Sequence, residues 1–195
     1  MPKVTRAVAD ENHIKIKASA ARLFAEKGMA EVTVAEVMQA AGMTHGGFYR
    51  HYESKIDLAA AACRYSFTNN AVGFFNMVSS RAVDESALDS LLRLYLSEQH
   101  RDTPGIGCPV TSYAADIMRE AYASPLKQEY INGVKYVLSE ITSLTPGTVL
   151  AERQEKAIGI LSTIVGALCI SRAVKGDAVS EQFLDAAKKF IKSSM

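Results

Sequence analysis

The stretch of residues 33–55 constrains the fold more than any other part of the chain. Thr33 is followed three residues later by Glu36, a spacing typical of a capping box, in which the two residues satisfy each other's backbone N–H groups. A short helix over residues 34–40 is expected next. Ala-Gly-Met at 41–43 then breaks the helix, because glycine is a poor helix former. These features predict two short helices joined by a tight turn, a helix-turn-helix.

The second helix of this unit is expected to start after Thr44, which can cap it, and to end near Tyr52. Its first turn holds Gly46 and Gly47, although each glycine costs about 1 kcal/mol relative to alanine in a helix interior. In a helix-turn-helix, the start of the second helix lies nearest the bases in the major groove. A tip without side chains would let the backbone approach DNA closely.

Polar and cationic side chains surround these two glycines. Tyr49, His51 and Lys55 are suited to phosphate contacts, His45 to a base edge, and Arg50 to either. Phe48 and Tyr52 are four residues apart and are expected in the core. No third metal ligand accompanies the two histidines. The residues expected to bind DNA are Thr33, Thr44, His45, Gly46, Gly47, Tyr49, Arg50, His51 and Lys55.

The rest of the chain is also patterned as helices, without the sustained alternation typical of strands. Residues 1 to about 10 are expected to form a flexible arm, followed by a helix that ends at Gly28. Ser54 can cap a long helix from Lys55 towards Val78. The sequence predicts an all-α protein of about nine helices, with the later ones at about 85–100, 109–122, 125–143, 151–174 and 180–193.

Composition is that of an ordinary globular protein. The chain has 195 residues, 48% of them hydrophobic, and a formal net charge of +1. Any attraction to nucleic acid must therefore come from a local arrangement of cations.

Three cysteines at long spacings indicate neither a disulfide framework nor a zinc site, and favour a reducing cytoplasm. No signal peptide is expected, and the apolar stretch between Lys156 and Arg172 is shorter than the roughly 20 residues of a membrane span.

Residues 16–58 resemble the DNA-binding domain of the TetR family of transcriptional repressors. The resemblance rests on TVAEVMQAAGMTHGGFYRHYESK at 33–55 and on Ile16, Ala20, Leu23, Phe24 and Gly28 before it. It implies a homodimeric repressor with a three-helix DNA-binding domain at 1–54 and a ligand-binding and dimerisation bundle at 55–195. The resemblance also implies a near-palindromic DNA operator and release by a small apolar or amphipathic effector. No cofactor or metal is expected.

Bulky and adaptable side chains in the second half could pack a core or line a ligand cavity. The residues expected to bind a ligand are Phe67, Phe74, Tyr95, Cys108, Tyr113, Asp116, Met118 and Tyr136. Cys108 could face the cavity, react as a thiol, or be a small buried residue, and Asp116 could be either a surface residue or a cavity charge.

The helix expected at 151–174 is apolar on two faces and therefore needs two partners. One partner is the bundle, and the other is expected to be a second subunit. The last helix repeats the amphipathic pattern. The residues expected at the dimer interface are Ile160, Ile164, Ala167, Phe183 and Phe190.

Two other functions remain open from the sequence. One is an enzyme with Cys108 as nucleophile and His100 as base, although no orienting third residue is evident. The other is a helical binding protein without DNA binding.

Overall fold

A computed structural model describes residues 6–82 and 85–195, and within these residues every regular element is a helix. The all-α prediction is confirmed, with ten α-helices where about nine were expected. The elements in chain order are α1 (Arg6–Lys27), α2 (Val34–Ala40), η1 (His45–Arg50), α3 (Lys55–Tyr65), η2 (Ser66–Ala71), α4 (Val72–Arg81), α5 (Ala87–Tyr95), α6 (Glu98–Asp102), η3 (Pro104–Ile106), α7 (Pro109–Ile117), α8 (Pro125–Leu144), α9 (Leu150–Ala173) and α10 (Val179–Ser193).

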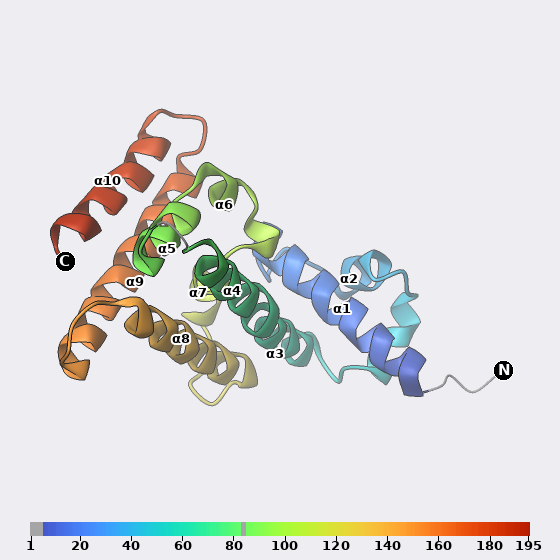
Figure 1. The fold of residues 1–195 in the computed structure, drawn as a ribbon. Coiled ribbons are helices and arrows are strands. Elements are labelled where there is room, and N and C mark those ends of the chain that lie inside the picture. The colour runs from blue at the N-terminus through green and yellow to red at the C-terminus, as the bar shows by residue number, and fades with distance from the viewer. Residues whose placement is uncertain (1–5, 83–84) are drawn as a thin grey trace.

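The N-terminal lobe is built from α1, α2 and η1, and it projects from one end of the larger helical body (Figure 1). Ile16 and Phe24 of α1, Val37 of α2 and Phe48 of η1 are almost fully buried in its core. The arm expected at residues 1 to about 10 is wrong for residues 6–10, which are part of α1; residues 1–5 lie outside the described residues. Gly28 ends α1 in the left-handed region, as its position after the last turn requires.

One long helical segment joins the lobe to the body. It begins with α3, passes through the π-helical segment η2 and continues as α4. Ser54 caps α3 by accepting the N–H of Asp57, as the sequence predicts. The π segment was not foreseen, and such segments are frequent at functional sites.

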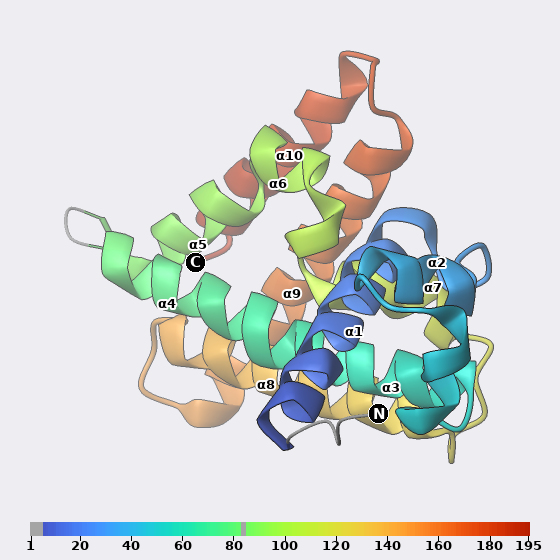
Figure 2. The ribbon, with the colours of Figure 1, turned by 90° about the vertical axis from the view of Figure 1, so that its right-hand side faces the viewer.

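The body differs from the sequence expectation in two helices. The helix expected at 85–100 is divided into α5 and α6, because Ser97 caps a new helix by accepting the N–H of His100. The helix expected at 109–122 ends at Ile117, and turns lead from there to α8. The short segment η3 packs against α1, so this part of the body supports the N-terminal lobe (Figure 2).

The helices α9 and α10 pack against each other along the edge of the body farthest from the lobe (Figure 1). Among the described helices, α9 alone is long and apolar enough to cross a membrane by length and composition, with a mean hydropathy of 1.5. One face of α9, which includes Ile160, Ile164 and Leu168, is buried, and the helix packs against α8 and α10 as a core helix of a globular protein does.

Candidate DNA-binding surface and ligand cavity

The turn between α2 and η1 has the geometry of a helix-turn-helix. Gly42 adopts a φ of +74°, which side chains rarely tolerate, and Met43 donates its N–H to the carbonyl of Met38. The expected capping box at Thr33 and Glu36 is present. Hydrogen bonds from Thr33, followed by one from Lys27, lower the pKa of Glu36 to about 2. The turn therefore fixes η1 against α2 through local contacts.

The tip of η1 is open to solvent. Gly46 is exposed, and a Cβ at this position would meet no atom within 4 Å. His45 and Arg50 are exposed, and Tyr49 is 73% exposed although it is aromatic. Phe48 points the other way and is buried. The structure thus brings backbone without side chains and several polar groups to the same surface.

Thr44, Thr33 and Lys55 are less free to contact DNA than the residues at the tip. Thr44 is the N-cap residue of η1, as expected, but its side chain makes no capping hydrogen bond. The segment η1 is a short 3₁₀ helix that ends at Arg50, two residues before the expected end near Tyr52. The hydroxyl of Thr33 is engaged by Glu36. Lys55 is half-buried at the start of α3.

His51 is turned towards α1 and not towards the exposed tip. Its ring lies edge-on to that of His13, with centroids 4.6 Å apart, and its Nδ1 is buried without a hydrogen-bond partner. Burial, followed by the nearby charges of His13 and Arg50, lowers its pKa. A phosphate contact by His51 would require its ring to rotate, so the structure does not support that expectation.

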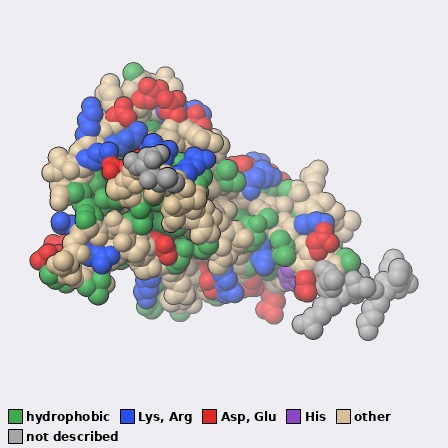
Figure 3. Space-filling model, viewed as in Figure 1, with side chains coloured by type: hydrophobic (Ala, Val, Ile, Leu, Met, Phe, Trp, Pro, Cys, Tyr) green, Lys and Arg blue, Asp and Glu red, His purple; other side chains and the backbone are tan. Residues whose placement is uncertain are grey.

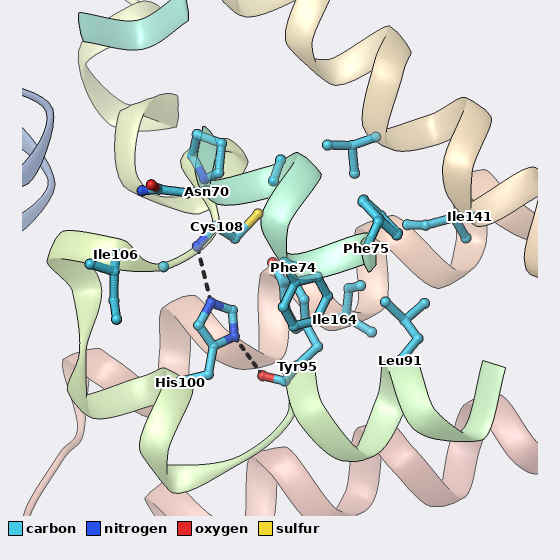
Figure 4. A pocket seen from close by; sticks show the side chains of 14 residues that line it. Asn70, Phe74, Phe75, Leu91, Tyr95, His100, Ile106, Cys108, Ile141 and Ile164 are labelled. Carbon is cyan, nitrogen blue, oxygen red and sulfur yellow. Dashed lines mark hydrogen bonds between the residues drawn. The ribbon is translucent and has the colours of Figure 1, made fainter. Parts of the chain in front are cut away.

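A cavity of about 50 Å³ lies in the body, between the α4 end of the long helical segment and α5, α8 and α9 (Figure 4). Its walls are almost entirely apolar. The residues that line it are Asn70, Ala71, Phe74, Phe75, Leu91, Tyr95, His100, Ile106, Gly107, Cys108, Pro109, Val137, Ile141 and Ile164.

His100 fixes one wall of this cavity. Its Nδ1 lies 2.8 Å from the carbonyl of Tyr95, and its Nε2 accepts the N–H of Cys108 at 3.0 Å, so the proton is on Nδ1 (Figure 4). Burial lowers the pKa of His100 to about 4. The imidazole is therefore neutral at physiological pH and joins the end of α5 to the start of α7.

Three of the eight residues expected to bind a ligand line the cavity: Phe74, Tyr95 and Cys108. The other five do not. Phe67 packs on α8, the hydroxyl of Tyr113 lies 3.3 Å from that of Ser66 in the core, and Tyr136 packs edge-on against Phe75. Met118 is 76% exposed on the turn after α7.

Asp116 is neither a free surface residue nor a cavity charge. Its carboxylate accepts the N–H of Met29, just beyond the end of α1, at 3.1 Å. This bond ties α7 of the body to the N-terminal lobe. This hydrogen bond could not be predicted from the sequence pattern, because the two residues are 87 positions apart.

The residues expected at the dimer interface divide into two groups. Ile160, Ile164 and Ala167 are buried within their own chain, so they cannot contact a partner, and Ile164 instead lines the cavity. Phe190 is 63% exposed and Phe183 is partly exposed. The outward face of α9 holds Ile158, Gly159, Ser162, Gly166 and Ile170.

The fixed turn and the exposed tip together form a helix-turn-helix on a larger helical body. Residues 16–62 match the family described as bacterial regulatory proteins, tetR family. The N-terminal part of the chain therefore carries a TetR-type helix-turn-helix DNA-binding domain. The two relatives described next are both named as transcriptional regulators.

The curated relatives described here match over part of the chain. The chain is 39% identical over 56 residues to YerO of Bacillus subtilis, an uncharacterized HTH-type transcriptional regulator, which is 29% of this chain and 19% of that protein. It is 33% identical over 69 residues to the regulator AcrR of Shigella flexneri, which is 35% of this chain and 32% of AcrR. The chain therefore matches less than a third of the length of each of these relatives.

Solved structures share the fold over nearly the whole chain. A TetR transcriptional regulator from Legionella pneumophila aligns with a TM-score of 0.76 and 17% identity, covering 100% of both chains. The reduced form of NemR from E. coli aligns with a TM-score of 0.73 and 14% identity, covering 93% of this chain and 96% of NemR. At these identities, the likeness of the body is one of fold.

Proposed function

We propose that the protein is a cytoplasmic homodimeric repressor that binds a near-palindromic operator and is released by a small effector. The observation that carries the proposal is the bare tip at Gly46, which stands beside exposed Tyr49 and Arg50 on a fixed turn. A tip of this kind is suited to the major groove, where the backbone and these side chains would contact phosphates and base edges.

Charge alone would give weak DNA binding by one subunit. Residues 1–60 hold eight Lys and Arg against seven Asp and Glu. On the face drawn in Figure 3, cationic and anionic side chains are interspersed over the lobe. A dimer would double the contacts, and two tips about one DNA turn apart would read the two halves of a palindrome.

The outward faces of α9 and α10 support a dimer. Ile158 and Phe190 are each more than half exposed, next to Gly159 and Gly166, where an added Cβ would meet nothing within 4 Å. Small residues beside large apolar ones allow two helices to approach closely. We infer a four-helix interface formed by α9 and α10 of two subunits.

Two connections could carry a change from the cavity to the DNA-binding tip. The first is the long helical segment, which lines the cavity at Ala71 and Phe74 and begins next to η1. The second is the 104–108 segment, which forms the opposite wall and lies against α1. A Cβ on Gly105 would fall 2.6 Å from Oε1 of Glu26 on α1. An effector that widened the cavity would displace both connections and change the spacing of the tips.

The geometry of Cys108 and His100 supports a regulator over an enzyme. Nε2 of His100 already accepts the N–H of Cys108, and Nδ1 donates to the carbonyl of Tyr95, so neither nitrogen is free to take the thiol proton. Its lowered pKa also makes His100 a weak base. The exposed tip likewise favours DNA binding over a binding protein that has lost it.

Fluorescence anisotropy with duplex DNA that flanks the gene of this protein tests the proposal. We expect Tyr49→Phe and Lys55→Gln to weaken binding to all sequences alike, because phosphate contacts carry no sequence information. His45→Ala and Arg50→Ala should also reduce the preference for the operator over random DNA. Absence of binding by the native protein at low salt would contradict the proposal.

A further inference from the structure

We propose that the cavity beside His100 selects a small uncharged molecule: an apolar body of on the order of five or six non-hydrogen atoms with one hydrogen-bonding group. The role of this molecule as an effector rests on the proposed function. Its binding does not, because the argument uses the cavity walls alone.

The size follows from the volume of the cavity. About 50 Å³ is room for roughly four water molecules. The volume that these molecules take up in the liquid is close to that of a ligand of about five or six non-hydrogen atoms. Phe74, Phe75 and Ile141 close the inner end, and their rings and branches lie close together (Figure 4). A long acyl chain or a multi-ring molecule would require these side chains to move.

The absence of available charge in the wall indicates an uncharged ligand. His100 is neutral, and both of its ring nitrogens are bonded. The nearest guanidinium, that of Arg172, lies behind Gly107 and donates to the carbonyls of His100 and Arg101. An ion in the cavity would lose its hydration without gaining an opposite charge, which is strongly unfavourable.

The polar groups of the cavity leave a single well-suited partner for a ligand. The hydroxyl of Tyr95 lies 3.1 Å from that of Thr111, and the Cys108 thiol lies beside it. Asn70 lines the cavity from η2, and its side-chain amide lies on the side of Ile106, away from Phe74 and Phe75 (Figure 4). We infer that this amide bonds the hydrogen-bonding group of the ligand. Ile106, which is 70% exposed, lies at the rim where a ligand would enter.

Three probes of nearly equal size test the selection: 1-butanol, butyrate and butylammonium, each added to the full-length protein at neutral pH and matched ionic strength. Saturation-transfer NMR and thermal unfolding report binding. We expect 1-butanol to raise Tm by roughly 3 to 6 °C at about ten times its dissociation constant. Neither ion should produce a saturable shift. Equal binding of butyrate or butylammonium, or no binding of 1-butanol, would overturn the inference.

Two variants place the binding in this cavity. Ala71→Leu fills it and should abolish the shift with 1-butanol. Asn70→Asp adds a charge to the wall without changing its shape, and should reverse the order so that butylammonium binds best. The matched control is Asn69→Asp, one residue earlier on η2, which lines a different groove. If Asn70→Asp and Asn69→Asp gave the same binding order, or if Ala71→Leu folded and still bound 1-butanol, the inference would fail.

DNA affinity measured with and without 1-butanol separates this inference from the proposed function. Binding of 1-butanol with unchanged DNA affinity would leave the selection intact and remove the effector role of such a ligand. Tight operator binding by a protein that binds none of the probes would overturn the selection and leave the proposed DNA binding intact.

Discussion

At the scale of single residues, His100 connects several helices of the body. It joins α5 to α7 through both ring nitrogens, stacks on the ring of Phe74 and lies edge-on to that of Tyr95. Because it is buried and already bonded, protonation would place a charge where no anion is present. Its titration is therefore coupled to folding.

The stability of the protein should fall as pH is lowered from about 6.5 to about 4. In this range the unfolded chain protonates His100 and the folded protein does not, so protons favour unfolding. The pKa difference corresponds to about 3 kcal/mol lost across the whole window. Urea unfolding at pH 7.0, 6.0 and 5.0 measures the loss. His100→Gln should be less stable at pH 7 but flatter with pH, and parallel curves for the two proteins would contradict the assignment.

Residues with local signals could be predicted from the sequence, and residues with distant partners could not. The capping box at Thr33 and the glycine turn at Gly42 depend on neighbours within a few positions, and both are present. His51 was expected to face DNA, but its ring is held by His13, 38 positions earlier. Nothing in the pattern around His51 indicates that contact.

At the scale of helices, the packing of η2 on α8 depends on one glycine. Gly133 on α8 lies against the ring of Phe67, and a Cβ at this position would fall 2.2 Å from its Cδ2. The ring is buried, so it has little room to move. This contact holds the π segment, and with it one wall of the cavity, against the body.

Gly133→Ala should destabilise the protein by about 1–3 kcal/mol, because the added methyl group forces Phe67 out of place. The matched control is Gly73→Ala on α4, where a Cβ would meet nothing within 4 Å. That change should be neutral or stabilise the protein by up to about 1 kcal/mol, because alanine is the better helix former. Chemical denaturation measures both. Equal stability of the two variants would show that Phe67 does not depend on Gly133.

The periodicity of apolar residues predicted where helices lie, but it did not predict where those helices are interrupted. The stretch 85–100 has continuous helical spacing, so the sequence predicts a single helix. In the structure Ser97 caps a new helix within this stretch. A π segment requires one more residue per turn and leaves no clear trace in sequence. The cavity lies at these two interruptions. The sequence therefore predicted only three of the residues that line it, and most of its lining residues were missed.

At the scale of the whole molecule, burial within one subunit determines which residues remain for a partner. The sequence shows that α9 is apolar on two faces but not which face the body covers. Ile160, Ile164 and Ala167 face inwards, and Ile158 and Phe190 face outwards. The proposed dimer therefore depends on the second pair.

Phe190→Glu should convert the dimer to a monomer, because it places a charge in an apolar interface. Light scattering coupled to size exclusion gives the mass, and circular dichroism checks the helix content. Met118→Glu is the matched control, since Met118 is also exposed but lies on the turn after α7. A native protein that is already monomeric at micromolar concentration, or a Phe190→Glu variant that stays dimeric, would contradict the interface.

The direct test of groove binding by the exposed tip is the DNA affinity of Gly46→Leu. Gly46 is exposed and a Cβ there would meet no atom within 4 Å, so we expect the fold and Tm to stay as in the native protein. We expect operator affinity to fall at least about tenfold, since a leucine would hold the backbone of η1 away from the duplex. Unchanged affinity in a folded Gly46→Leu protein would show that this tip does not approach DNA.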